Sequence, residues 1–310
     1  GGEVEEAVSE LKPGQVLLLE NLRFYSGEKD NDVEFARRLA SLADLYVNDA
    51  FGTAHRAHAS TAGVPNVMGG GAAGFLMAKE LKYLYGVLDD PEKPVVTILG
   101  GDKVSDKIGV IRSFFPFTST FLIGGGMAFT FLRAQGVGCG ESLVEEDKVG
   151  LARELLKEAR LAGVEVLLPV DHVVGSTLSQ DVQVEPCLAR SVPDQKMGLD
   201  IGPRSVEQFK QVIADAGTII WNGPMGVFEI NSCASGTIEI ARAVAGADAT
   251  SIVAGGDSAA AVRRAGVSDS ITHISTGGGA SLTLLSGEPL PGVEALTDRK
   301  EEQFECRENR

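Results

Sequence analysis

The sequence has little of several residue types, and each shortage excludes a class of protein. It contains only four cysteines, Cys139, Cys187, Cys233 and Cys306, and none belongs to a CxxC pair. We therefore expect free thiols in a reducing compartment and not a disulfide-rich scaffold. The longest apolar runs, such as PVVTIL, are far shorter than the ~20 residues that span a bilayer. We expect no role in a membrane.

Positive charge is also in short supply. Lysine and arginine total 28 against 43 aspartates and glutamates, which gives a formal net charge of -15. Because nucleic-acid grooves need concentrated positive surface, no nucleic-acid partner is expected. Any anionic ligand must be held locally, by glycine-rich loops, helix N-termini and a few placed basic side chains.

The sequence does contain a regular alternation of strand-like runs and segments of helical period. The runs are VLLLE, LYVNDA, PVVTIL, TFLIG, VEVLLPV, GTIIW, TSIVA and THIS. Strands that alternate with helices predict an α/β fold with parallel sheets. The predicted division is a partial first domain over 1–73, an interdomain helix over 74–90, a second, doubly wound domain over 91–285 and a C-terminal tail over 286–310.

Four predicted strands of the second half run directly into glycine-rich turns, namely ILGGDKVSDK, LIGGGMAF, IVAGGDSAAAV and ISTGGGASL. A single turn of this kind usually only reverses the chain. Ligands of open α/β sheets bind at the carboxyl ends of strands, so four such turns predict one shared anion site.

Two of these turns carry charged side chains suited to phosphates. Lys103 and Lys107 are four positions apart, so a helix that starts near Lys103 would present both ammonium groups on its first turns. Ordinary lysines on a solvated helix face are the alternative. In GGDSAAAV, Ser258 is typical of an N-cap, and Asp257 can hold Mg²⁺, because a cation that bridges phosphates needs only one or two carboxylates. Alternatively, Asp257 caps the helix.

The motif WNGPMGVFE follows the predicted strand GTII and contains a rigid turn beside the lone Trp221. Such a turn can present Val227 to a base and Glu229 to ribose hydroxyls. A tight turn next to a buried tryptophan is an equally good interpretation of these residues alone.

Eight strings together resemble phosphoglycerate kinases, in that family's own order: LLLENLRFYSGEK, NDAFGTAHRAHAST, GGDKVSDK, GGGMAFTFL, MGLDIGP, WNGPMGVFE, GGDSAAAV and HISTGGGASLTLLSG. The resemblance covers nearly all of residues 1 to 296. It implies two Rossmann-like parallel-sheet domains joined by a hinge helix, of which the N-terminal one is incomplete, and closure of one domain on the other.

The resemblance further implies reversible phosphoryl transfer between 1,3-bisphosphoglycerate and ADP, giving 3-phosphoglycerate and ATP in glycolysis or carbon fixation. ADP or ATP would bind with Mg²⁺ to the second domain, and the phosphoglycerate to the first. The implied enzyme is a monomer in the cytoplasm or, alternatively, in the plastid stroma. Its nucleophile is ionised at neutral pH in either direction, so it needs no general base.

Roles for individual residues follow from the same resemblance. Lys103 would accompany the transferring phosphoryl group, Lys107 the inner phosphates and Asp257 the Mg²⁺. The implied catalytic residues are Lys103, Gly277, Gly278 and Gly279. The implied nucleotide-binding residues are Gly101, Lys107, Gly125, Gly198, Asn222, Pro224, Val227, Glu229, Gly255, Gly256, Asp257 and Ser258. The implied clamp for the phosphate of the glycerate is Arg23 and Arg56.

Two positions depart from the family pattern, and the more harmless of them is Ala254, which replaces a usual glycine. Asp102 stands where the family usually has alanine, and a carboxylate beside Lys103 is expected to weaken nucleotide binding through like-charge repulsion. Family members also carry, ahead of the point where this sequence begins, a strand with substrate-binding Asp and Asn and a catalytic arginine. A working kinase and a fragment that binds nucleotide without turnover are therefore both open. A dinucleotide-dependent oxidoreductase is disfavoured, because no GxGxxG follows a predicted strand and precedes a ribose-binding acid.

Overall fold

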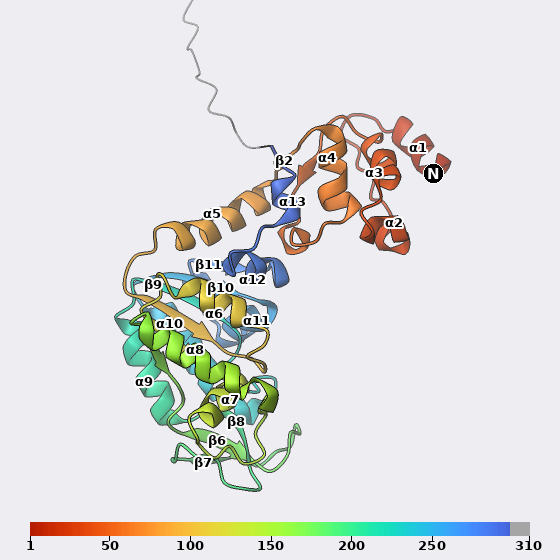
Figure 1. The fold of residues 1–310 in the computed structure, drawn as a ribbon. Helices are drawn as coiled ribbons and strands as arrows, with labels where there is room; N and C mark the ends of the chain where they lie inside the picture. The colour runs from red at the N-terminus through yellow and green to blue at the C-terminus, as the bar shows by residue number, and fades with distance from the viewer. Residues whose placement is uncertain (298–310) are drawn as a thin grey trace, which may run out of the picture. The chain divides into compact units, whose positions relative to one another are not determined.

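The computed structural model describes residues 1–297, which divide into two compact units. The first unit comprises Gly1–Lys79 with the described residues from Pro289 onward, and the second comprises Glu80–Glu288. Helix α5, Phe75–Asp89, passes from the first unit into the second along the chain (Figure 1).

The segment that follows residue 286 differs from the predicted tail. Its residues from Pro289 belong to the first unit, because their backbone is hydrogen-bonded there. The N–H of Gly292 donates to the carbonyl oxygen of Ala54 at 2.8 Å, and the N–H of Thr297 donates to that of Gly71 at 2.9 Å. The rest of the predicted tail, 298–310 with Cys306, lies outside the described residues.

The first unit contains a small parallel sheet of two strands, β1 (Val47–Asn48) and β2 (Ala72–Ala73). Its α-helices are α1 (Gly2–Ser9), α2 (Ser26–Lys29), α3 (Val33–Ala40), α4 (Val64–Met68) and α13 (Pro291–Glu294). Two 3₁₀ turns and a π turn complete it: η1 (Leu22–Phe24), η2 (Phe51–Thr53) and η3 (Ala59–Gly63).

The strand predicted over VLLLE was wrong. Residues 15–20 form no strand, and the side chains of Val16 and Leu18 are each 92% exposed. A strand forms where a neighbour pairs its backbone N–H and C=O groups. Among residues 1–297 no strand pairs with this segment, so its apolar pattern alone does not make it part of a sheet.

The second unit is built on a six-stranded parallel sheet in the order β11-β10-β9-β3-β4-β5, which confirms the predicted α/β class. Its strands are β3 (Val95–Leu99), β4 (Thr120–Ile123), β5 (Glu165–Leu167), β9 (Thr218–Asn222), β10 (Thr250–Ala254) and β11 (His273–Ser275). From β3 the chain adds β4 and β5 toward one edge of the sheet, and from β9 it adds β10 and β11 toward the other. The strand order therefore reverses between β3 and β9, where doubly wound sheets bind their ligands.

Helices cover this sheet, which explains why its strands read as continuous apolar runs. Every residue of β3, β4 and β9 is buried. The helices are α6 (Ile108–Phe114), α7 (Met127–Ala134), α8 (Val149–Leu161), α9 (Pro203–Ala214), α10 (Ser235–Gly246), α11 (Gly256–Ala265) and α12 (Gly279–Leu285). Helix α10 packs against both α9 and α11, and the three share a core that includes Phe209, Trp221, Ile240 and Val262.

Between β5 and β9 the chain forms a small antiparallel sheet that the sequence did not predict. Its order is β7-β6-β8, with β6 (His172–Gly175), β7 (Glu185–Cys187) and β8 (Met197–Ile201). The described cysteines Cys139, Cys187 and Cys233 carry free thiols. Within residues 1–297, no helix combines the length and the apolar character that crossing a membrane requires.

Candidate functional site

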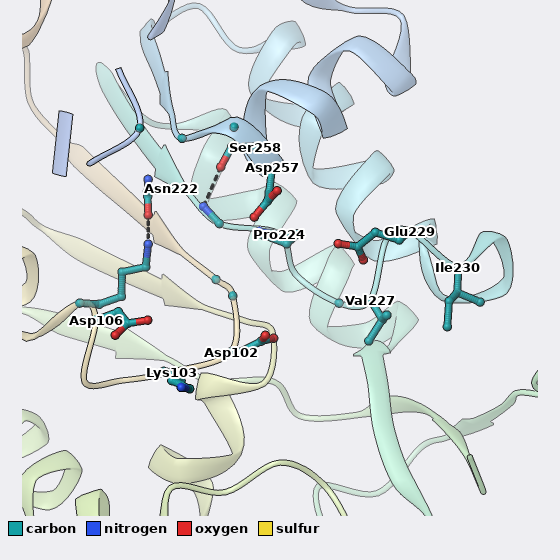
Figure 2. A pocket seen from close by; sticks show the side chains of 18 of the residues that line it. Asp102, Lys103, Asp106, Asn222, Pro224, Val227, Glu229, Ile230, Asp257 and Ser258 are labelled. Carbon is teal, nitrogen blue, oxygen red and sulfur yellow. Dashed lines mark hydrogen bonds between the residues drawn. The ribbon is translucent and has the colours of Figure 1, made fainter. Parts of the chain in front are cut away.

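The larger pocket of the second unit, of about 1000 Å³, lies at the carboxyl edge of the six-stranded sheet (Figure 2). The turns that follow β3, β9 and β10 form much of its wall. Predicted site residues that line it are Gly101, Lys103, Lys107, Asn222, Pro224, Val227, Glu229, Gly255, Gly256, Asp257, Ser258 and Gly278. The structure thus brings most of the predicted nucleotide site together at the point where the strand order reverses.

Glycines let the turns after β3 and β9 touch backbone to backbone. The N–H of Gly100 donates to the carbonyl oxygen of Asn222 at 2.9 Å, and the N–H of Gly101 donates to that of Pro224 at 3.0 Å. A Cβ on Gly100 would lie 2.0 Å from the carbonyl oxygen of Pro224. Any side chain at this position would therefore push the two turns apart.

Lys107 immediately precedes α6 and lines the larger pocket. Its Nζ donates to Oδ1 of Asn222, and Nδ2 of Asn222 donates to the carbonyl oxygen of Ala254 at 2.7 Å. Asn222 thereby connects the ends of β9 and β10 to the lysine. Burial lowers the pKa of Lys107, although the charges of Asp106 and Asp257 act in the opposite direction. A phosphate could take the place of Asn222 as the partner of this ammonium group.

The prediction that a helix starts near Lys103 was wrong, because α6 begins only at Ile108. The carboxylate of Glu145 holds the preceding loop instead. It accepts the N–H groups of Val104 at 2.5 Å and Ser105 at 3.2 Å, and the Ser105 hydroxyl at 2.8 Å. These local bonds compete with the helix ladder. Lys103 is exposed on the loop, and no residue of the described chain forms an ion pair with it.

Helix α11 directs its N-terminus at the same pocket. Its N-cap is Gly255, with φ +98°, and no side chain caps the helix. The expectation that Ser258 is the N-cap was therefore wrong: its buried hydroxyl accepts the N–H of Gly223 at 2.7 Å (Figure 2). This leaves the first amides of a ten-residue helix available to an anion.

Asp257 lies exposed in the first turn of α11 and lines the larger pocket. The structure, as far as residue 297, contains no group of three or more His, Cys, Asp or Glu side chains that could hold a metal ion. One exposed carboxylate in a pocket that also holds two lysines fits a Mg²⁺ ion that arrives with a nucleotide, since such an ion keeps several waters and takes few protein ligands.

The structure confirms the tight turn beside a buried tryptophan in WNGPMGVFE, whereas the contacts of Val227 with a base and of Glu229 with ribose stay predictions. Trp221 is fully buried, and its Nε1–H donates to the carbonyl oxygen of Gly223 at 2.7 Å. The same turn places Pro224, Val227 and Glu229 on the wall of the pocket. The tryptophan therefore supports the backbone of the turn that faces the ligand.

A smaller, neighbouring pocket of about 320 Å³ contains two predicted residues that do not line the larger one, Gly125 and Gly198. Both permit close packing. A Cβ on Gly125 would lie 2.6 Å from the backbone nitrogen of Gly101, and one on Gly198 would lie 2.1 Å from the ring of Phe129. Most side chains that line this pocket are apolar, and Asp102, Glu141, His172 and Asp200 are the ionisable ones. The apolar side chains are Phe129, Leu143, Pro169, Leu178, Met197, Leu199, Ile201, Met225 and Val227.

The three predicted glycines after β11 take different places. Gly278 lines the larger pocket and Gly279 begins α12. Gly277 does not line the pocket, and its N–H donates to the Ser275 hydroxyl at 3.2 Å. The carboxylate of Glu80, on α5, accepts the N–H of Thr276 at 3.2 Å and so holds the start of this turn.

Arg23 and Arg56 belong to the first unit, so the structure does not place them relative to the nucleotide pocket. Both side chains are exposed. Nε of Arg56 donates to Nε2 of His55 at 3.2 Å. Burial, and then the charge of Arg56, lowers the pKa of His55, so its imidazole is neutral at pH 7 and can accept this bond.

Sequence reasoning missed part of the lining of the larger pocket, chiefly Asp106, Leu282 and the segment Leu178, Ser179 and Gln180. That segment connects β6 and β7 of the antiparallel sheet. No glycine turn or charge pair distinguishes it in the sequence, so only the fold identifies it. Asp106 could have been noticed as the neighbour of Lys107.

The larger pocket can bind a polyphosphate without acid–base groups. Two ammonium groups and the N-terminus of α11 supply positive charge at the pocket, whose lining also carries the carboxylates of Asp102, Asp106, Glu229 and Asp257. Its described lining contains no histidine or cysteine. The arrangement suits reactions that depend on alignment and charge stabilisation.

Comparison with known proteins gives the same family at every level. The family model described as phosphoglycerate kinase matches residues 1–288. The chain is 54% identical over 301 residues to "Phosphoglycerate kinase" of Synechococcus sp. (strain JA-2-3B'a(2-13)), covering 96% of this chain and 73% of that protein. It is equally identical to "Phosphoglycerate kinase, cytosolic" of Nicotiana tabacum, covering 96% of this chain and 75% of that protein. The solved structure of phosphoglycerate kinase from Coxiella burnetii superposes with a TM-score of 0.86 at 41% identity, over 92% of this chain and 73% of that one. The chain belongs to the phosphoglycerate kinase family.

Proposed function

We propose that this chain transfers a phosphoryl group reversibly between 1,3-bisphosphoglycerate and ADP, giving 3-phosphoglycerate and ATP. The observation that carries the proposal is the convergence of Lys103, Lys107 and the uncapped N-terminus of α11 on one pocket between β3 and β9. This convergence supplies local positive charge for the nucleotide phosphates in a chain whose net charge is -15.

The proposed phosphoryl transfer needs no group that this pocket lacks. In one direction the attacking atom is an oxygen of the terminal ADP phosphate, and in the other it is a carboxylate oxygen of 3-phosphoglycerate. Both are ionised at neutral pH, so no general base is needed. The protein contributes by aligning the reactants and by stabilising charge on the transferred group.

Each residue has a separate task in this proposal. Lys107, held by Asn222, binds the inner phosphates, while the exposed Lys103 is free to follow the phosphoryl group that is transferred. Asp257 holds the Mg²⁺ that enters with ADP or ATP. When bound, this ion neutralises charge on the phosphate oxygens. Backbone N–H groups of the turn Gly277, Gly278 and Gly279 would stabilise negative charge on the transferred phosphoryl group. In the structure only Gly278 of the three lines the larger pocket, and the N–H of Gly277 is donated to Ser275.

In this proposal Arg23 and Arg56 bind the phosphate of the glycerate.

The surroundings of Arg23 in the first unit favour a second candidate function. Within the described chain, the guanidinium of Arg23 makes no hydrogen bond, and residues 15–20 nearby pair with no strand and are exposed except for the half-buried Leu19. A phosphate clamp needs side chains held by their surroundings. The second candidate is therefore nucleotide binding without turnover.

We also propose that the protein acts as a monomer on these small molecules in the cytoplasm. The relative of Nicotiana tabacum that is named cytosolic supports this location, and the plastid stroma is the alternative. Light scattering on the purified chain should give a mass near 32.5 kDa. A mass twice as large would contradict the proposed monomer.

The experiment that separates the candidates measures binding and turnover on the same preparation. MgADP is titrated by calorimetry and by the fluorescence of Trp221, and ATP formation from 1,3-bisphosphoglycerate is followed in a coupled assay. Turnover on the order of 1 to 100 per second establishes the kinase. Binding with no measurable turnover establishes the second candidate. Absence of MgADP binding would exclude both.

The matched control replaces a lysine away from the pocket. Lys157 is exposed on α8 and does not line the larger pocket, so Lys157→Met removes one charge without touching the site. Its affinity for MgADP should equal that of the unchanged protein, whereas Lys107→Met should bind MgADP at least about 10-fold more weakly.

A further inference from the structure

The two pockets of the second unit meet along a short junction. Five residues line both pockets: Gly101, Asp102, Leu178, Gly226 and Val227. Among these, Asp102 has the only side chain that forms hydrogen bonds, since the others are glycines or apolar. This carboxylate is therefore the side chain that can accept a hydrogen bond from a ligand at the junction.

The character of each pocket decides which end of a nucleotide it takes. The smaller pocket is bordered by Phe129, Leu143 and Met197, which suits a flat, largely apolar base. The larger pocket holds Lys103 and Lys107, which suit phosphates. A nucleotide bound in this direction places its sugar at the junction. This step rests on the proposed function.

The backbone fixes the position of Asp102. The preceding Gly101 donates its N–H to the carbonyl oxygen of Pro224 and accepts the N–H of Met127 with its own carbonyl oxygen, each at 3.0 Å. On the other side, a Cβ on Gly126 would lie 3.3 Å from Cα of Asp102. The loop thus has little freedom to carry this carboxylate away from the junction.

The carboxylate itself has no partner in the part of the chain that the structure describes. Asp102 is exposed, and neither a hydrogen bond nor an ion pair joins its side chain to residues 1–297. Figure 2 shows it directed into the open space across from the loop that carries Val227. An ionised carboxylate only accepts hydrogen bonds, so it needs a donor from the ligand.

We infer that Asp102 accepts a hydrogen bond from a ribose hydroxyl of the bound nucleotide and thereby makes the site selective for ribonucleotides over deoxyribonucleotides. A hydroxyl is the donor that the sugar offers, whereas the phosphates offer none and repel the carboxylate. Asp102 is then a specificity residue at the centre of the nucleotide site. The smaller pocket holds the base on one side of it and the lysines hold the phosphates on the other.

The inference and the expected like-charge repulsion predict opposite results for Asp102→Ala. If repulsion of the phosphates dominates, the variant binds ADP and its deoxy analogues more tightly, and by the same factor. If the ribose contact dominates, the variant loses affinity for ADP alone. The ratio of dissociation constants for a deoxy analogue and ADP therefore isolates the hydroxyl contact, because phosphate repulsion cancels in the ratio.

The test measures dissociation constants of ADP, 2′-deoxyADP and 3′-deoxyADP, each with Mg²⁺, by calorimetry. In the unchanged protein at least one deoxy analogue should bind on the order of 10-fold more weakly than ADP, as expected for a hydrogen bond to a charged acceptor. In Asp102→Ala this ratio should approach one, and Asp102→Asn should restore part of it, since its amide oxygen still accepts. Melting temperatures should not change, because the side chain is exposed and unpartnered.

Glu229→Gln is the competing variant, because the turn after β9 can present Glu229 to the ribose hydroxyls from the larger pocket. The inference is overturned if the ratio is near one in the unchanged protein, if Asp102→Ala leaves it intact, or if only Glu229→Gln abolishes it. It is also overturned if Asp102→Ala changes the dependence on Mg²⁺ with the ratio unaltered, which would assign the carboxylate to the ion. Failure of the unchanged protein to bind ADP would instead defeat the proposed function.

Discussion

Nε2 of His273 lies 2.8 Å from the carboxylate of Glu80, and both side chains are at least 95% buried, with exposures of 5% and 4%. The imidazole also stacks on Tyr83, with ring centroids 4.7 Å apart. The other oxygen of Glu80 accepts the N–H of Thr276 at 3.2 Å. Helix α5 is thereby attached to β11 and to the glycine turn that follows it.

Loss of one member of this pair should destabilise the second unit strongly. His273→Ala leaves the Glu80 carboxylate buried without its partner, so we expect a loss of about 3–5 kcal/mol in the free energy of unfolding. Glu80→Gln removes the charge and should cost less. Denaturant unfolding followed by Trp221 fluorescence measures both. A loss below about 1 kcal/mol for His273→Ala would show that the pair contributes no more than an exposed one.

The pair also sets an acid limit for stability. Burial by itself raises the pKa of Glu80, but hydrogen bonds from His273, Ser275 and Thr276 outweigh it and hold the pKa below its usual value of 4.5. The unfolded chain therefore binds the proton more readily than the folded one. The stabilisation is present above pH 4.5 and is lost as the pH falls through the lower folded value. Glu80→Gln should remove this part of the acid transition.

Asp200, on β8, should show the opposite pH dependence. Burial raises the pKa of its carboxyl to about 7, although it accepts the N–H groups of Gly236 at 2.7 Å and Ile201 at 2.9 Å. The folded protein then holds the proton more tightly than the unfolded chain. The stabilisation is complete below the unfolded value of 3.8 and is lost as the pH rises through about 7.

Asp200→Asn should therefore gain stability relative to the unchanged protein as the pH rises from 4 to 7, by up to about 4 kcal/mol. Urea unfolding at a series of pH values measures the difference. Asp215→Asn, at an exposed position after α9, is the control and should show a constant difference. A constant difference for Asp200→Asn as well would mean that its carboxyl does not titrate in this range.

The two lysines of the larger pocket should separate turnover from affinity. Lys103→Ala should lower kcat by roughly 10² to 10³ with a much smaller effect on the KM for MgADP, because its charge acts on the transferring group. Lys107→Met should mainly weaken nucleotide binding, since Lys107 is already held in place by Asn222. Steady-state kinetics on both variants, beside the Lys157→Met control, decide between these roles. An unchanged kcat for Lys103→Ala would remove it from the catalytic set.

Asp257→Asn should weaken the response to Mg²⁺ more than the binding of metal-free ADP. The carboxylate supplies the charge that the ion needs, while metal-free ADP relies on the lysines and on the amides of α11. Calorimetric titrations with and without Mg²⁺ measure both affinities. Equal losses in the two titrations would exclude this role for Asp257, which does not cap the helix either.

Local patterns in the sequence determined much of the second unit. Seven of the eight predicted strand runs contain a strand in the structure. They could be predicted because the spacing of apolar residues, which distinguishes strands from helices, is visible within a short stretch of sequence. The glycine turns after β3, β4, β10 and β11 were predicted to meet at one site, since the carboxyl ends of parallel strands share an edge. The turns after β3, β10 and β11 do line the larger pocket, whereas the turn after β4 lines only the smaller one. The long motifs identified the family directly.

Only the tertiary structure decided which distant residues meet. Lys107 and Asn222 are 115 positions apart, and their contact depends on β3 pairing with β9, which no local pattern specifies. The same holds for Leu178 at the pocket. Residues 15–20 show the reverse case, since an apolar run becomes a strand only when a partner pairs with its backbone. The hydroxyl of Ser258 accepts the N–H of Gly223 instead of capping its own helix. The reason is again tertiary, because a buried N–H group bonds to the acceptor that the folded chain brings next to it.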